Sequence, residues 1–203
     1  MKSKRRLIGN ISITVGLILL LGAGGLFFFN MLENNSFDED SFDLAEQVRS
    51  EMEHTDESIE GSVPEETDKV ELTELKTRKI GDGVFDGILA IPAIELEMSV
   101  YDTWNDEYLR KSICRYYGSP YTDDFVIAGH NYRSGFGKLK KLKTGDEVFF
   151  TDMDGVTTRY IVKQLEVLNG TDISGMLSGD WPLSLYTCTY GGSARLTVRC
   201  EKA

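Results

Sequence analysis

The chain has 203 residues and a formal net charge of −11 at pH 7. This length suits one ordinary domain with extensions, and three cysteines are too few for the disulfide framework of a small secreted domain. The cysteines and the two histidines form no CxxC or HxxxH pair, so the sequence predicts no structural zinc site. Most of the excess acidic residues lie between Met31 and Lys79. The net charge therefore describes this segment and says little about a substrate.

The N-terminal segment predicts a membrane anchor. Residues 1–6 carry four basic side chains, and residues 7–29 form a run of 23 residues without a charge. As a helix this run would span roughly 34 Å, enough to cross a hydrocarbon core of about 30 Å. The basic flank predicts a cytoplasmic N-terminus and an external C-terminal part. A cleaved signal peptide is the alternative, with small residues at 22–25, but the apolar run exceeds the ~7–15 residues of a signal h-region.

Residues 30–79 are predicted to form an acidic extracellular linker. Their composition is typical of a solvated, self-repelling spacer. Within the linker, residues 41–54 (SFDLAEQVRSEMEH) could form a short helix with Ser41 as its N-cap.

From about residue 80 the sequence is dominated by short strand patterns, which indicate a closed β-barrel or a β-sandwich. Turns are predicted at Asp154-Gly155 and Gly191-Gly192, and a break between strands at Pro92. Residues 105–114 (NDEYLRKSIC) are predicted to form a short helix, and GFGKLKKL one or two helical turns.

The stretch SLYTCTYGGSARLTVRC, residues 184–200, reads as strand, turn and strand. Because side chains alternate faces along a strand, Cys188 points away from the face that carries Leu183 and Leu185. After the turn, Arg195 and Arg199 lie on the face opposite Leu196. Two adjacent strands could therefore place a thiol and a guanidinium on one non-core surface.

Cys188, His130 and Arg195 are the candidate chemical groups. A thiol attacks a carbonyl as the thiolate, and the pKa of a free cysteine is about 8.5. A nearby imidazole promotes the thiolate and later protonates a leaving amine. A guanidinium stays charged and can hold a carbonyl or a developing oxyanion. These roles suit acyl transfer.

The other two cysteines are predicted to be structural. Cys200 lies on the Leu196/Val198 face, and Cys114 is placed in the short predicted helix. A disulfide between them is allowed by number, but two buried free thiols are favoured.

Three separated blocks of the sequence resemble, in order, those of the sortase family. LYTCTYGGSARLTVRC is similar to the sortase signature, in which TLxTC precedes the arginine of the last barrel strand by several residues. AGHNYRSGFGKLKKLKTGDEVFF resembles the segment with the family's histidine, and LAIPAIELEMSVYD resembles its opening strands. The resemblance covers roughly residues 87–201, together with the anchor. Ser184 stands where the family often has Thr.

The resemblance implies an all-β fold, a closed eight-stranded sortase-type β-barrel with short helices. It implies that Cys188 is the nucleophile, His130 its acid–base partner and Arg195 the catalytic arginine, whereas Arg199 is the weaker candidate and Arg199→Lys is expected to be nearly silent. Thr187 and Asn131 are assigned to substrate binding. No metal ligand or cofactor is implied, although some members of the family are stimulated by calcium.

The implied substrates are secreted proteins with a C-terminal LPxTG-like sorting signal. The enzyme would cleave a Thr-Gly-type bond and transfer the acyl group to an amine of a peptidoglycan precursor or a pilin. The implied location is the cell membrane, with a single span and an extracellular catalytic domain, and no nucleic acid is expected as a partner.

The subclass expected is class A-like or class D-like. No hydrophobic segment follows Glu201, whereas many pilin polymerases carry a second anchor, and residues 168–183 are too few for the helical insertion of class B. Two alternatives stay open, an L,D-transpeptidase-like cell-wall enzyme and a non-catalytic membrane-tethered surface protein. The domain boundaries predicted are 1–6 (cytoplasmic tip), 7–29 (anchor), 30–79 (linker) and 80–203 (catalytic domain).

Overall fold

The computed structural model describes residues 2–57, 74–177 and 181–203. The chain divides into two compact units, Met1–Ser36 and Phe37–Ala203. Part of the predicted linker, residues 58–73, lies outside the described residues. The second unit contains all the strands and is the one that positions the candidate site.

A long helix, α1 (Lys2–Glu57), covers the predicted anchor and the first part of the predicted linker. Its apolar run makes it the one helix among the described residues that is long and apolar enough to cross a membrane. The helix continues past residue 30, where the sequence predicted a spacer, because Phe37, Ala45 and Val48 are buried in the second unit. Packing on one face thus stabilises a helix that composition alone does not predict. Ser41 lies inside this helix, so it is not an N-cap.

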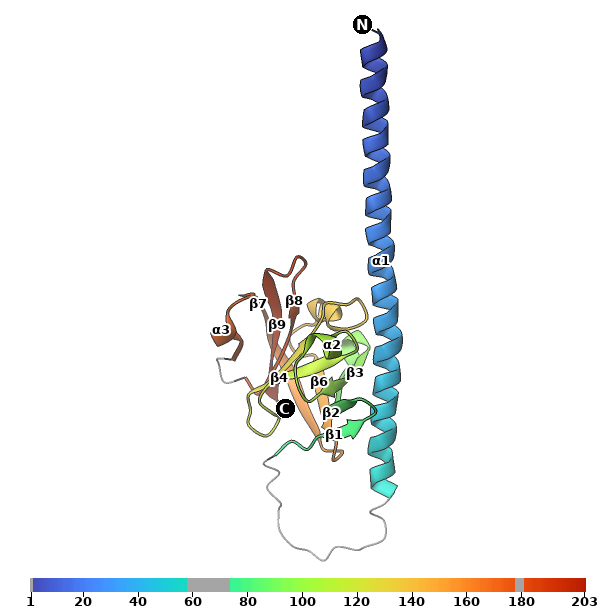
Figure 1. Cartoon of the computed structure of the whole chain (residues 1–203). Coiled ribbons are helices and arrows are strands. Elements are labelled where there is room, and N and C mark those ends of the chain that lie inside the picture. Colours follow the sequence, from blue (N-terminus) through green and yellow to red (C-terminus); the bar gives the residue numbers. More distant parts are fainter. Residues whose placement is uncertain (1, 58–73, 178–180) are drawn as a thin grey trace, which may run out of the picture. The chain divides into compact units, whose positions relative to one another are not determined.

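Nine strands form one sheet in the order β1-β2-β3-β4-β5-β8-β9-β7-β6 (Figure 1). Their bounds are β1 Arg78–Ile80, β2 Gly83–Ile91, β3 Leu96–Tyr101, β4 Ile113–Tyr117, β5 Phe125–Gly129, β6 Glu147–Asp152, β7 Thr157–Asn169, β8 Leu183–Cys188 and β9 Ala194–Lys202. An additional pairing of β2 with β6 closes the sheet. Because β1 only extends one edge, β2–β9 form a closed eight-stranded barrel, as predicted.

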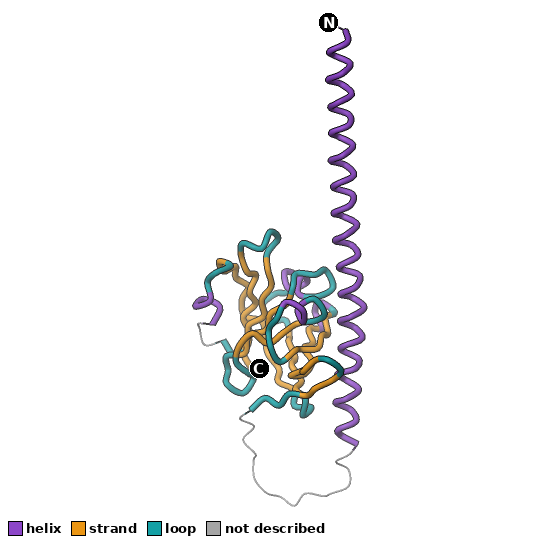
Figure 2. Tube along the Cα trace, viewed as in Figure 1, coloured by secondary structure: helices purple, strands orange, loops and turns teal. Residues whose placement is uncertain are grey.

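Four short helical segments connect the strands (Figure 2): η1 Pro92–Ile94, α2 Asp106–Leu109, η2 Phe136–Lys141 and α3 Ile173–Leu177. Asn105 caps α2, since its side chain accepts a hydrogen bond from the Tyr108 amide at 2.8 Å. The predicted extent of this helix is wrong. It ends at Leu109, and Cys114 lies in β4, where it pairs with Tyr101 of β3.

The apolar interior has two parts. One fills the barrel and includes Phe125, Leu185 and Cys200. The other includes Val48 of α1 together with Phe85 and Cys114. Cys114 and Cys200 are both buried and both free, which confirms that they are structural thiols and not a disulfide.

Candidate active site

Three neighbouring strands bring His130, Cys188 and Arg195 to one end of the barrel. β5 and β8 are parallel, and Gly129 pairs with Thr187. His130 directly follows β5, and Cys188 is the last residue of β8, so each lies one residue beyond the Gly129–Thr187 pair. β8 and β9 are antiparallel, and Cys188 pairs directly with Arg195. The pairing therefore sets the cysteine between the histidine and the arginine.

The face on which Cys188 lies agrees with the sequence prediction. Leu183, Leu185 and Thr187 are buried inside the barrel, whereas Tyr186 and Cys188 are partly exposed. Gly191 and Gly192 form the turn to β9 with φ values of +88° and +75°, a region that favours glycine. The turn returns the chain tightly enough for the Thr189 amide to donate to the Ala194 carbonyl at 2.9 Å.

The loop that follows His130 is compact. Phe136 is fully buried, and a Cβ on Gly129 would lie 2.7 Å from its ring, so glycine is needed at the end of β5. The Gly137 amide donates to the Tyr132 carbonyl at 3.0 Å. The Tyr132 ring meets the His130 imidazole edge to face, with ring centroids 5.3 Å apart. The imidazole is thus held by an ordered loop.

Arg195, which pairs with Cys188, lines a hollow of about 410 Å³. Its Nη1 donates to the Gly192 carbonyl at 2.9 Å, which orders the guanidinium near the turn. The other lining residues are Trp104, Tyr116, Asn169, Gly170, Thr171, Asp172, Ile173, Met176 and Tyr186. The sequence analysis did not identify these lining residues. Tyr186 could have been identified, because side chains two residues apart on a strand lie on the same face, and Cys188 follows it by two residues. Burial, followed by the proximity of Tyr116, raises the pKa of Tyr186.

Arg199 is buried, in contrast to the solvent-facing residue that the sequence implied. Its Nε donates to Glu166 at 2.7 Å, and Nη1 donates to Ser184 Oγ at 2.8 Å. The guanidinium also donates to the carbonyls of Met176 at 2.9 Å and Gly175 at 2.6 Å. Arg199 lies on the predicted face of β9, opposite Leu196, but α3 covers this face at the position of Arg199. Because this network is buried, the structure predicts that Arg199→Lys lowers stability, whereas its effect on turnover stays a prediction.

The two predicted substrate-binding residues lie in different surroundings. Asn131 is exposed and follows His130 directly. Thr187 is 2 % exposed, and within the described part of the chain its hydroxyl has no hydrogen-bond partner. The roles assigned to both stay predictions, and the buried side chain of Thr187 lies off the face that carries Cys188.

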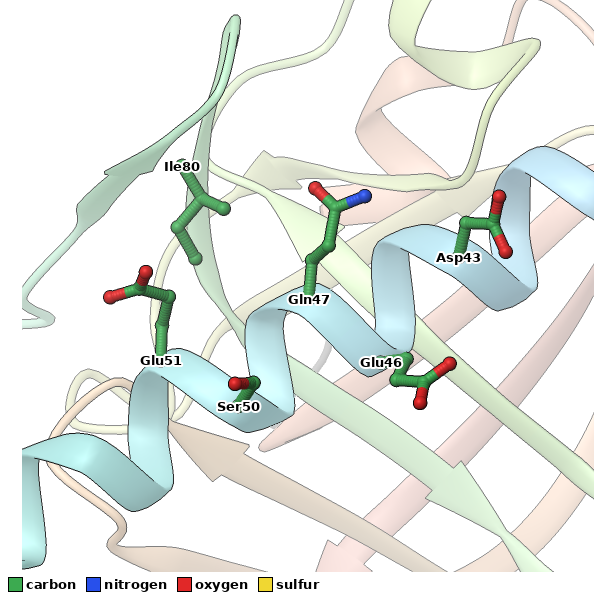
Figure 3. A pocket seen from close by; sticks show the side chains of 6 residues that line it. All are labelled: Asp43, Glu46, Gln47, Ser50, Glu51 and Ile80. Atoms are coloured by element: carbon green, nitrogen blue, oxygen red, sulfur yellow. The ribbon is translucent and has the colours of Figure 1, made fainter.

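A second hollow of about 430 Å³ lies between α1 and β1 (Figure 3). Its lining residues are Asp43, Glu46, Gln47, Ser50, Glu51 and Ile80. The predicted site residues are absent from this lining, so the hollow is separate from the candidate active site. Among the described residues, no cluster of three or more His, Cys, Asp or Glu side chains could hold a metal ion.

One protein family matches most of the barrel domain. Residues 89–203 match the family model of the sortase domain. The chain is 26% identical to sortase A from Corynebacterium diphtheriae (a lid mutant), over 58% of this chain and 69% of that one, with a TM-score of 0.52. It is 25% identical to sortase C-1 from Streptococcus pneumoniae, over 59% and 67% of the two chains, with a TM-score of 0.52.

Sortase C1 from Streptococcus agalactiae matches over 78% of this chain and 89% of that one, at 24% identity and a TM-score of 0.54. A search of curated proteins found no match. Because the matching structures include both sortases A and sortases C, the subclass stays a prediction. The family model covers more than half of the chain, and the closed barrel is the fold of the matching structures. The chain therefore belongs to the sortase family.

Proposed function

We propose that this sortase is a membrane-anchored transpeptidase in which Cys188, His130 and Arg195 perform the chemistry on a C-terminal sorting signal. Family and fold indicate a cysteine transpeptidase. The observation that carries the assignment to these residues is the strand register. It pairs Cys188 with Arg195 across β8 and β9, and Cys188 and His130 each lie one residue beyond the last pair of β8 with β5.

In the proposed first step, the Cys188 thiolate attacks the carbonyl carbon of a Thr-Gly-type bond. Arg195 stabilises the oxyanion of the tetrahedral intermediate, since a guanidinium stays charged and offers several donors. As the intermediate collapses, the C–N bond breaks and the His130 imidazolium gives its proton to the departing amine. The product is a thioester between the substrate acyl group and Cys188.

In the second step an amine attacks the thioester. Neutral His130 takes the proton of this amine, the new amide bond forms, and the Cys188 thiolate leaves. The acceptor we propose is an amine of a peptidoglycan precursor or a pilin. The donor proteins are secreted and end in an LPxTG-like signal. The hollow beside Arg195, with walls that include Tyr116, Tyr186 and Met176, suits the apolar part of such a signal.

Mass spectrometry of a trapped intermediate tests this proposal. The full chain in detergent micelles is incubated with a sorting-signal peptide, with or without triglycine as the acceptor. We expect an acyl adduct on Cys188, release of the C-terminal fragment, and a new amide when the acceptor is present. Cys188→Ala should abolish all three, because no other accessible thiol is available among the described residues. An adduct on Cys114 or Cys200, or turnover by Cys188→Ala, would overturn the assignment.

A further inference from the structure

The second half of α1 contacts the loop that carries the candidate histidine. Phe37 is 2 % exposed, although it lies in an acidic segment that composition predicts to be solvated. Its ring packs against Tyr132, with centroids 4.4 Å apart. Tyr132 in turn meets the His130 ring at 5.3 Å. Three aromatic rings therefore form an unbroken line from the helix to the imidazole.

The loop is shaped to accept Phe37. A Cβ on Gly135 would lie 2.9 Å from both Cε1 and Cζ of the Phe37 ring, so the absence of a side chain at Gly135 leaves the space that the ring fills. The neighbouring Ser134 hydroxyl donates to the carboxylate of Asp38. Farther along the helix, Arg49 forms an ion pair with Glu97 of β3. Polar contacts at Asp38 and Arg49 thus also hold this part of the helix on the barrel domain.

His130 lies just beyond the end of β5 and is partly exposed. An edge-to-face aromatic contact has a preferred geometry, so the Tyr132 ring restricts the rotation of the imidazole. Tyr132 is itself only partly buried, and its ring is supported on the helix side by Phe37. Phe37 thus supports, from the helix side, the ring that the imidazole contacts.

We propose that Phe37, acting through Tyr132, is a positioning residue for His130, and that the docked part of α1 is needed for full catalytic turnover. This inference rests on the proposed function, because it assumes that His130 is the acid–base group. Phe37 does not touch the reacting atoms. Its loss should lower the fraction of enzyme with a correctly oriented imidazole, which lowers kcat, while the peptide hollow beside Arg195 and hence KM stay nearly unchanged.

The test compares Phe37→Ala with Phe42→Ala in the full chain in detergent micelles. Phe42 is the matched control, since it lies on the same helix and is 69% exposed. We expect Phe37→Ala to lower kcat about three- to tenfold with KM changed less than about twofold, the size of one lost aromatic contact. Phe42→Ala should behave as the unmodified chain. Equal kcat for the two variants would overturn the inference, as would a fall confined to KM.

A spectroscopic readout separates positioning from a general loss of stability. The ¹³Cε1 signal of His130, assigned with His54→Gln, reports the ring current of Tyr132. Phe37→Ala should shift this signal although Tyr132 is still present, and Phe42→Ala should not. Gly135→Ala, which displaces the Phe37 ring, should reproduce both the shift and the lower kcat. Tyr132→Phe keeps the ring and should retain most of the turnover. An unmoved His130 signal in Phe37→Ala would contradict the proposal.

The two proposals fail in different ways. If Cys188→Ala or His130→Gln retains turnover, the proposed function itself is wrong. If both are inactive while Phe37→Ala, Gly135→Ala and Phe42→Ala match the unmodified chain, the site stands and only the positioning role of Phe37 is excluded.

Discussion

Individual residues of the same type have different roles in this protein according to their position in the barrel. Cys114 and Cys200 are fully buried, and burial raises the pKa of each thiol to about 12. These two thiols therefore stay protonated at ordinary pH and cannot act as nucleophiles. Cys188 is partly exposed at the end of β8. Exposure and register, more than residue type, distinguish the candidate nucleophile.

The first residue-scale prediction contrasts two cysteines. Cys188→Ala should leave the free energy of unfolding within about 0.5 kcal/mol of the unmodified chain, since the site is partly exposed. Cys200→Ala removes a buried group from the barrel core and should lower that free energy by about 1 kcal/mol or more. Urea unfolding and peptide turnover measure both. The folded fraction of Cys200→Ala should remain active, and stability losses in the reverse order would contradict the assignment.

The second prediction contrasts two arginines on one face of β9. Arg195→Lys keeps the positive charge but loses the planar guanidinium and its several N–H donors. Turnover should therefore fall at least about tenfold, with little effect on folding. Arg199→Lys cannot replace the hydrogen bonds to Glu166, Ser184 and α3, and should lower the free energy of unfolding by about 2–3 kcal/mol. Unfolding curves and steady-state kinetics should separate the two. Normal stability in Arg199→Lys would refute the buried network.

At the scale of elements, a buried ion pair joins β2 to β4. Asp86 is fully buried, and Arg115 Nε lies 2.9 Å from its carboxylate. That Nε hydrogen is directed to the Asp102 carbonyl, also at 2.9 Å, and the Asp86 oxygens have no hydrogen-bond partner among the described residues. Desolvation by burial outweighs the attraction of Arg115 and raises the pKa of Asp86 to about 7.

This pair predicts a pH dependence of stability. Between the ordinary pKa of 3.8 and about 7, folded Asp86 holds a proton that the unfolded chain has released. The contribution of Asp86 to stability should therefore fall as pH rises through this window, by at most about 1.4 kcal/mol per pH unit. Asp86→Asn should flatten the stability profile between pH 4 and 7, as measured by urea unfolding.

Asp82→Asn, in the exposed turn between β1 and β2, is the matched control. It should leave the pH profile parallel to that of the unmodified chain. If Asp86→Asn also leaves the profile parallel, the buried carboxyl is not the origin of the pH dependence.

Local patterns predicted those elements whose neighbours are close in sequence. The strands on either side of Asp154-Gly155 and the glycine turn before β9 follow from alternation and turn chemistry. The same patterns misassigned Cys114, because β4 is a strand through its pairing with β3 and β5, which lie elsewhere in the sequence. The burial of Arg199 beneath α3 and of Phe37 beside the histidine loop depends on contacts between residues far apart in the sequence. For the same reason, the register of His130 and Cys188 could be inferred only from the family resemblance.

At the scale of the whole molecule, charge and apolar surface are segregated along the sequence. The four basic residues within 1–6 precede an uncharged, mostly apolar run, and acidic residues are concentrated after it. In α1 the apolar side chains of that run, including Leu19, Leu21 and Phe27, are exposed in the structure. An exposed apolar helix of this length is long enough to cross the hydrocarbon core of a bilayer. The barrel, by contrast, buries its apolar residues within itself.

The last prediction concerns membrane topology. Because basic residues next to a membrane span stay on the cytoplasmic side, residues 1–6 should lie inside and residues 31–203 outside. Protease added to intact protoplasts should remove the catalytic domain, while an epitope tag placed before Met1 should be protected until the membrane is permeabilised. Replacing the four basic residues of the tip with glutamine should reduce the fraction of chains with this orientation. Protection of the catalytic domain in intact protoplasts would contradict the topology. Release of the unmodified domain into the medium without added protease would support the cleaved-signal alternative, because a retained anchor keeps the enzyme at the surface where secreted substrates emerge.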